Sequence, residues 1–145
     1  MNSLSIQNCY NEKITILNKI KGKDTLNNRS DLWVKRVYDK AAWSQSSTSG
    51  ISGTTVVVGT KIKVILTDLS DYVPYKEFCR FGDFGKYFTI SLNDYIVRGE
   101  VTENVDASNI TKILSRYEPE VLKVQSIITV PNRGFTNASM KLEGV

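Results

Sequence analysis

Residues 86–101 decide how the rest of the chain is arranged, and they read Lys-Tyr-Phe-Thr-Ile-Ser-Leu-Asn-Asp-Tyr-Ile-Val-Arg-Gly-Glu-Val. Apolar and polar side chains alternate on both sides of the pair Asn93-Asp94. Asn and Asp tolerate the left-handed backbone of a tight turn, so the pattern predicts a hairpin of two short strands. The residues expected on its inward faces are Phe88, Ile90 and Leu92 in the first strand and Tyr95, Val97 and Val101 in the second.

Period-two patterns, or runs rich in β-branched and aromatic residues, predict further strands on either side of this stretch. A turn at Gly59 is expected between two of them, and a turn at Pro131–Gly134 is expected between the last two. The predicted strands are Lys13–Ile20, Leu32–Trp43, Thr54–Val58, Lys61–Leu66, Val121–Val130 and Ser139–Val145. Their inward residues are expected to be Ile14, Ile16, Ile20, Ile62, Val64, Leu66, Leu122, Val124, Ile128, Val130, Met140 and Leu142.

One segment has the period of a helix instead. Apolar residues recur at i, i+3, i+4 and i+7 from Ile110 to Tyr117, Asp106 or Ser108 can cap the start, and Pro119 marks the end. We therefore expect a short α-helix over about residues 109–117. The chain as a whole, residues 1–145, is predicted to be a single mainly-β domain. Its predicted architecture is a small antiparallel β-barrel or sandwich with this one helix.

Two segments are predicted to be loops. Residues 44–53, Ser-Gln-Ser-Ser-Thr-Ser-Gly-Ile-Ser-Gly, are expected to form a flexible surface loop or one that orders only against a partner. Residues 68–85 combine many aromatic residues with Pro74 and two glycines, so these rings either close one end of a barrel or form a docking surface. The residues expected to contact partners from these loops are Ser47, Ser49, Ile51, Tyr72, Tyr75, Phe78, Arg80, Phe81 and Phe84.

The composition fits one globular domain in a reducing compartment. The 145 residues carry a formal net charge of +4, and the basic residues are dispersed along the chain, which argues against specific recognition of nucleic acid. Cys9 and Cys79 are expected to be free thiols. Met1–Tyr10 lacks the apolar core of a signal peptide, and no apolar run approaches the ~20 residues that span a bilayer. We therefore expect folding in the cytoplasm and no membrane segment.

The residue inventory does not favour catalysis. The chain contains no histidine, which excludes imidazole general bases and Cys–His or Ser–His catalysis. The close acid pairs Asp68 with Asp71 and Glu118 with Glu120 stand beside turn residues, where solvated carboxylates are usual. The glycines around Phe84 lack the Lys-Ser/Thr of a phosphate-binding loop. We therefore expect a non-enzymatic protein with no catalytic residues, no cofactor and no metal.

The order of these segments resembles the small minor structural proteins of tailed bacteriophages and prophages that complete the head or join it to the tail. The resemblance covers most of the chain and lies in spacing and order rather than in a single motif. Its features are the opening strand Tyr10–Lys19, the Trp33–Trp43 segment running into a Ser/Gly loop, Lys61–Leu66 leading to Tyr72-Val73-Pro74-Tyr75, the stretch Asn93–Glu100 and the closing Met140–Gly144.

The resemblance implies a β-barrel adaptor or head-closure (stopper) protein of the head–tail connector, or neck. Such a protein forms an oligomeric ring of six or twelve copies between the portal or adaptor and the tail proteins. The implied location is the virion, assembled in the cytoplasm of the bacterial host, with at most non-specific contact with packaged DNA. Two other classes stay open from the residues: a barrel module that binds single-stranded nucleic acid, suggested by the basic pI and the aromatic segment, and an enzyme of unknown type.

Overall fold

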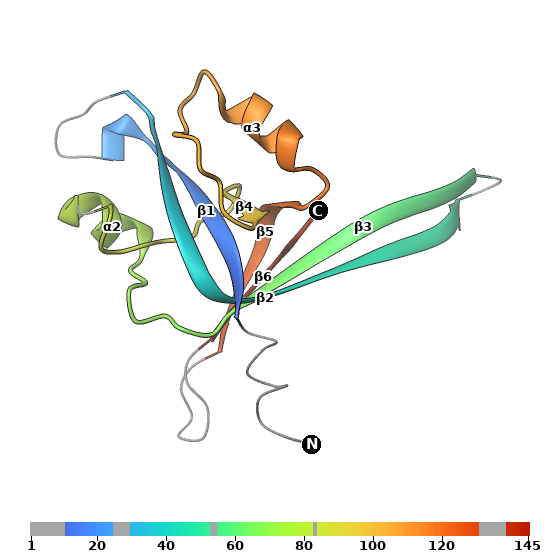
Figure 1. The fold of residues 1–145 in the computed structure, drawn as a ribbon. Helices are drawn as coiled ribbons and strands as arrows, with labels where there is room; N and C mark the ends of the chain where they lie inside the picture. Colours follow the sequence, from blue (N-terminus) through green and yellow to red (C-terminus); the bar gives the residue numbers. More distant parts are fainter. Residues whose placement is uncertain (1–10, 25–29, 53–54, 83, 131–138) are drawn as a thin grey trace.

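A computed structural model describes residues 11–24, 30–52, 55–82, 84–130 and 139–145, and between residues 47 and 60 the description is of the backbone. Antiparallel strands form a closed barrel in the order β1-β2-β3-β6-β5-β4 (Figure 1). The strands are β1 Glu12–Ile20, β2 Leu32–Ser52, β3 Thr55–Leu66, β4 Tyr95–Arg98, β5 Val121–Val130 and β6 Ser139–Gly144. A 3-10 turn, η1, covers Gly22–Asp24, and two short helices are α2 Tyr75–Phe81 and α3 Ile110–Tyr117. The predicted mainly-β barrel is therefore confirmed.

The barrel interior is filled by side chains of strands whose alternating apolar and polar residues were recognisable in the sequence. Ile14 and Ile16 of β1 are fully buried, as are Val64 and Leu66 of β3 and Leu142 of β6. Successive side chains of a strand point to opposite faces, so each strand contributes every second residue to one core. The strand predictions for 13–20, 121–130 and 139–145 are confirmed within one residue at each end. The predicted turn at Pro131–Gly134 lies outside the described residues.

Strands β2 and β3 extend well beyond the barrel as a two-stranded ribbon (Figure 1). They pair continuously from Ala41 with Leu66 to Ser52 with Thr55. The prediction of a flexible loop at 44–53 is therefore wrong for 44–52, and Gly53 lies outside the described residues. The predicted turn at Gly59 is also wrong, because Gly59 pairs with Thr48 inside one unbroken strand. The β-branched segment before Gly59 supplies the strand preference that the Ser-rich partner lacks, so cross-strand pairing overrides local composition.

The predicted hairpin at 86–101 is only half right. Asn93 has the positive φ of 74° expected of a turn, and the Asp94 N–H donates to the carbonyl of Ser91 at 3.1 Å. However, β4 pairs with β1 and β5, not with residues 86–92. Phe88 and Ile90 turn into the barrel core instead of forming a ladder, and Leu92, predicted inward, is 57% exposed.

Strand β4 is buried on both faces, whereas its alternating sequence predicted only one buried face. Ile96 packs inside the barrel, whereas Val97 and Val101 pack outside it beneath α3. Tyr95 is half-buried on this outer side. The predicted grouping of Tyr95, Val97 and Val101 is thus correct, but their face is the one that helix α3 covers.

Helix α3 confirms the predicted helix and covers the outer face of β1 and β4. Its Ile113 is buried against Leu17 and Val97. Before the helix, the Asp106 carboxylate accepts the backbone N–H groups of Ser108 at 2.8 Å and Asn109 at 3.0 Å. Asp106 therefore holds the turn that leads into the helix. The prediction that Asp106 or Ser108 caps the helix is wrong, because the residue in the capping position is Asn109.

A bulge redirects the second half of β5. The register of β5 against β6 shifts between Val124 and Ser126. An extra residue at that point moves the following side chains to the other face. Leu122 and Val124 are fully buried as predicted, but Ile128 and Val130, also predicted inward, are 45% and 41% exposed.

A buried polar contact ties the start of β4 to β1. Asn18 of β1 donates through Nδ2 to the Asp94 carboxylate at 2.7 Å and to the carbonyl of Thr89 at 2.8 Å. The same carboxylate oxygen accepts the Ser91 N–H at 2.8 Å. Asp94 is only 5% exposed, and its burial raises the pKa of the carboxyl to about 6 although these donors oppose the shift.

This buried carboxyl makes stability depend on pH. Because its pKa in the folded protein, about 6, is above the ordinary 3.8, its contribution to stability is fully present below pH 4 and is lost as the pH rises through 6. The Asp94→Asn variant keeps an oxygen acceptor but does not titrate. Between pH 4 and pH 7 we expect the unfolding free energy of the variant to gain about 2–3 kcal/mol relative to the unmodified protein, measured by urea denaturation. A difference that stays constant over this range would contradict a buried, ionising Asp94.

Candidate interaction surface

The aromatic segment 68–85 is not one long loop, because it contains helix α2. Pro74 precedes the helix in an extended conformation, and Gly82 ends it with a φ of 70° and donates its N–H to the carbonyl of Phe78 at 3.2 Å. A proline before and a left-handed glycine after a helix are recognised boundary signals. The pair Pro74 and Gly82 could therefore have revealed α2 in the sequence. Asp83 lies outside the described residues.

Several of the predicted docking residues are core residues. Phe78 is 1% exposed and packs with Ile20 and Val34, and its ring lies 4.9 Å from that of Phe84. Tyr72 packs against the barrel core, with its ring 5.8 Å from the ring of Phe88. For these rings, the structure supports the alternative that they close one end of the barrel.

Tyr75 also has a structural environment. Its hydroxyl donates to the Asp24 carboxylate at 2.8 Å and accepts the Lys21 N–H at 3.2 Å. Burial is the main cause that raises the pKa of this phenol above its usual range. These contacts fasten α2 to the end of β1.

Arg80 and Phe81 remain as the surface part of the segment. Phe81 is 49% exposed, its ring lies 5.4 Å from that of Tyr87, and the Arg80 guanidinium carbon lies 5.9 Å from the centre of the Phe81 ring. An exposed aromatic ring beside a guanidinium is typical of interface residues. We call Arg80, Phe81 and Tyr87 the α2 patch.

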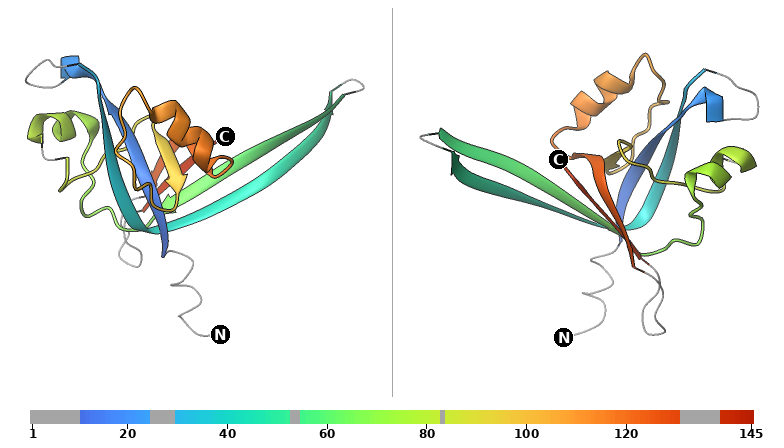
Figure 2. Two further views of the ribbon diagram at one scale, coloured as in Figure 1. Left: turned by 45° about the horizontal axis from the view of Figure 1, so that its top comes forward. Right: turned by 180° about the vertical axis from the view of Figure 1, so that it is seen from behind.

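The other predicted contact residues lie far from the α2 patch. Ser47, Ser49 and Ile51 all belong to the part of β2 that forms the ribbon. All views show the ribbon and α2 on opposite sides of the barrel (Figures 1 and 2). The residues predicted to contact partners thus belong to two separate surfaces.

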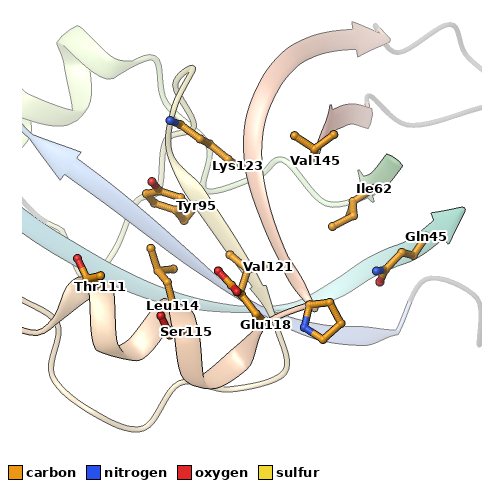
Figure 3. Close-up of a pocket in the computed structure, with 11 residues that line it drawn as sticks. Gln45, Ile62, Tyr95, Thr111, Leu114, Ser115, Glu118, Val121, Lys123 and Val145 are labelled. Atoms are coloured by element: carbon orange, nitrogen blue, oxygen red, sulfur yellow. The ribbon is translucent and has the colours of Figure 1, made fainter. Parts of the chain in front are cut away.

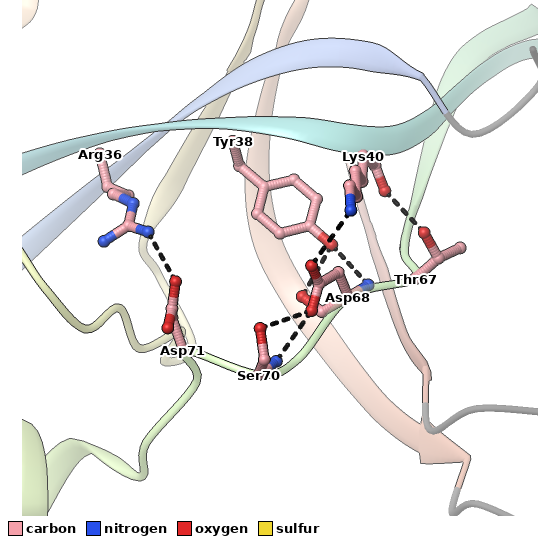
Figure 4. A network of polar contacts seen from close by, with 7 residues as sticks. All are labelled: Arg36, Tyr38, Lys40, Thr67, Asp68, Ser70 and Asp71. Carbon is pink, nitrogen blue, oxygen red and sulfur yellow. Dashed lines mark hydrogen bonds and ion pairs between the residues drawn. The ribbon is translucent and has the colours of Figure 1, made fainter.

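A polar network fixes the chain between the ribbon and α2 (Figure 4). The Tyr38 hydroxyl donates to the Asp68 carbonyl at 2.9 Å and accepts the Asp68 N–H at 2.8 Å. The Asp68 carboxylate accepts from Ser70, which lowers its pKa, while Asp71 pairs with Arg36 at 3.2 Å. Asp68 and Asp71 therefore bind different partners, and together they hold the segment against β2.

A groove opens between α3 and the base of the ribbon, with a volume of about 670 Å³ (Figure 3). Leu114 and Ser115 line it from the helix, and Gln45 and Ile62 line it from the ribbon strands. A second hollow, of about 490 Å³, lies on the other side of Tyr95 and Lys123, which line both. Its walls carry the rings of Trp33, Tyr75 and Tyr95 and the side chains of Lys19, Lys21 and Lys123.

This second hollow was not predicted from the sequence. Trp33, Tyr95 and Lys123 come from three different strands, and only the order of strands in the closed barrel brings them together. Among the described residues, no group of three or more His, Cys, Asp or Glu side chains could hold a metal ion. The same part of the chain contains no helix long and apolar enough to cross a membrane. Cys79 is a free, buried thiol, and Cys9 lies outside the described residues.

One family model matches residues 9–145, and its description is "Family of unknown function (DUF6751)". No match was found among curated proteins or among solved structures.

Two phenylalanines of helix α2 test which part of this segment is core and which is surface. Phe78→Ala should lower the unfolding free energy by about 3–5 kcal/mol, because it leaves a cavity between α2 and the barrel. Phe81→Ala, the matched control three residues later, should change it by about 0.5 kcal/mol or less, because that ring is half exposed. Urea denaturation followed by tryptophan fluorescence measures both. Equal losses would contradict the division of this segment into a core part and a surface part.

Proposed function

The chain belongs to DUF6751, a family of unknown function, and for it we propose the role of a non-enzymatic structural protein of the tailed-phage virion. In this role it forms a ring of six or twelve copies at the head–tail connector and helps to close the head or to join the tail. The proposal starts from the resemblance in segment order described above. Its place of action would be the virion, after assembly in the cytoplasm of the bacterial host.

The observation that carries the proposal is the ribbon that projects from a closed barrel. The six strands pair around a closed barrel, whereas beyond the barrel β2 and β3 pair only with each other among the described residues. A two-stranded ribbon is only marginally stable in water, so it needs another surface to pack on. A rigid body with a projecting arm suits a ring in which each copy reaches the next.

The two surfaces also suit a component that is stacked between others. The α2 patch and the ribbon lie on opposite sides of the barrel, so one can face a neighbouring copy while the other faces a different virion protein (Figure 2). We assign the portal or adaptor and the tail proteins as these further partners. The net charge of +4 is compatible with non-specific contact with packaged DNA.

Virion content tests this function. Tailed particles purified from a host that encodes the chain should contain its peptides by quantitative mass spectrometry, at six or twelve copies per particle. Deletion of its gene should give DNA-filled heads that lack tails or lose their DNA, as seen by electron microscopy. Particles that contain the portal and tail proteins but no trace of this chain would contradict the proposal.

The hollow beside Tyr95 favours a second candidate, a module that binds single-stranded nucleic acid. Trp33, Tyr75 and Tyr95 offer rings on which bases could stack, and Lys19, Lys21 and Lys123 offer positive charge beside them. Asp24 and Asp94 also line the hollow, which weakens it as a phosphate site.

Fluorescence anisotropy with a labelled oligonucleotide distinguishes this candidate. If the hollow binds a strand, the double variant Lys21→Glu/Lys123→Glu should lose affinity by about tenfold or more at low salt, because two cations become anions. Lys112→Glu, on the exposed face of α3, is the control and should bind better than the double variant. Absence of binding by the unmodified protein at low salt would remove this candidate.

A further inference from the structure

The ribbon leaves two long strand edges open. Among the described residues, β1 pairs with β2 only between Leu32 and Ala41, and β6 pairs with β3 only between Ile62 and Leu66. Beyond these limits the outer edges of 42–52 and 55–61 have no neighbouring strand in the part of the chain that the structure describes. Each such edge presents a row of backbone N–H and C=O groups that can pair with another strand.

A third open edge lies on β5. Strand β4 pairs with β5 only at Val121–Lys123, and backbone hydrogen bonds from Asn93 and to Asp94 extend this contact to Val124. Past that point the described residues offer β5 no neighbour on this side, while β6 occupies the other side. Within the described part of the chain, residues 126–130 therefore have an open edge, and Ile128 and Val130 on it are 45% and 41% exposed.

Neither region carries the features that normally protect an edge. Natural edge strands are guarded by charged side chains or proline. The sequence contains no Asp, Glu, Lys or Arg from Ala41 to Thr60, the longest uncharged run in the chain, and none from Val124 to Val130. Proline is also absent from both runs. By contrast, the paired parts of the barrel strands all carry charges, such as Lys63 of β3 and Lys141 of β6.

We propose that an outer edge of the ribbon in one copy pairs with the β5 edge, residues 126–130, of a second copy. The proposal deepens the ring function proposed above and rests on it. The β5 edge carries no charge, and the ribbon edges carry only Lys61 at their base, which suits strand pairing and offers little to phosphate groups. The two edges are different surfaces, so the contact is head to tail and every copy can both give a ribbon and receive one. Such contacts close into a ring when the rotation between copies allows it.

Two variants remove one side of the contact each. In the first, residues 47–60 are replaced by Asn-Gly, which joins the paired residues Ser46 and Lys61 by a two-residue turn and removes the ribbon. In the second, Ile128→Lys places a charge on the β5 edge. Leu92→Lys is the matched control, because Leu92 is also a large exposed apolar residue but lies outside both edges. Val130→Lys replaces Ile128→Lys if far-UV circular dichroism shows that the latter does not fold.

Light scattering coupled to size-exclusion chromatography over a range of concentrations gives the mass of each protein. The unmodified chain and Leu92→Lys should assemble. The Ile128→Lys variant should elute at the mass of one full-length chain, 16.3 kDa, and the ribbon-free variant should elute at the smaller mass of its own shortened monomer. Mixed together, these two monomeric variants should form a heterodimer and nothing larger, since one supplies only a ribbon and the other only a β5 edge. Neither variant should do so alone.

Three results would overturn the pairing: an unmodified chain that stays monomeric at every concentration, assemblies that persist in both edge variants, or a mixture of the two variants that remains monomeric. Assemblies that persist in both variants would leave ring formation standing through another surface. Conversely, heterodimers from the mixture together with absence of the chain from purified virions would support the pairing and overturn the virion function alone.

Discussion

The shortness of β4 is the constraint on which the rest of the structure depends. Its four residues, Tyr95–Arg98, form the only described strand between β1 and β5, so they close the barrel. Both ends of the strand are held by polar contacts. At the start, Asn18 binds the buried Asp94 carboxylate, and at the end Arg98 pairs with Glu12 at 3.0 Å and with Glu120 at 3.6 Å. A closing strand of this length covers only part of β5, and no other described residue pairs with residues 126–130 on that side. The shortness of β4 thus explains both how the barrel closes and why part of β5 is left uncovered.

Much of the barrel was predictable because alternation reports the face of a strand directly. Ile14, Ile16, Val64, Leu66 and Leu142 are all buried as predicted. The errors fall where pairing geometry overrides local pattern. A bulge after Val124 turned Ile128 and Val130 outward, and nothing in the composition of β5 marks its position. Residues 86–92 have a strand pattern, but Phe88 and Ile90 point into the end of the barrel and only Phe88 forms a bridge, to Tyr72. The ribbon looked like a loop because serine and glycine dominate one of its strands, although the facing strand is β-branched.

The candidate surfaces were less predictable, since they depend on which elements the closed barrel brings together. Burial separated the aromatic residues of segment 68–85 into core rings, such as Phe78, and the surface pair Arg80 and Phe81. The sequence alone could not distinguish rings that close the end of the barrel from rings that form a docking surface, because aromatic residues are common in both places. The hollow beside Tyr95 and the open β5 edge have no local signature at all. The functional proposal therefore depends on topology: a closed barrel carries a projecting ribbon whose outer edges have no neighbouring strand among the described residues.

Amide hydrogen exchange tests most directly the central claim that the barrel closes within one copy, while the ribbon of that copy pairs with residues 126–130 of another. In a monomeric edge variant, Ile128→Lys, amides of β1 should exchange only through global unfolding, whereas outward-facing amides of 42–52 and 55–61 should exchange at rates near those of an unfolded chain. In the assembled unmodified protein, protection should appear in the ribbon and in residues 126–130 together. Ribbon amides as protected in the monomer as those of β1, or assembly without added protection in these two regions, would contradict the account.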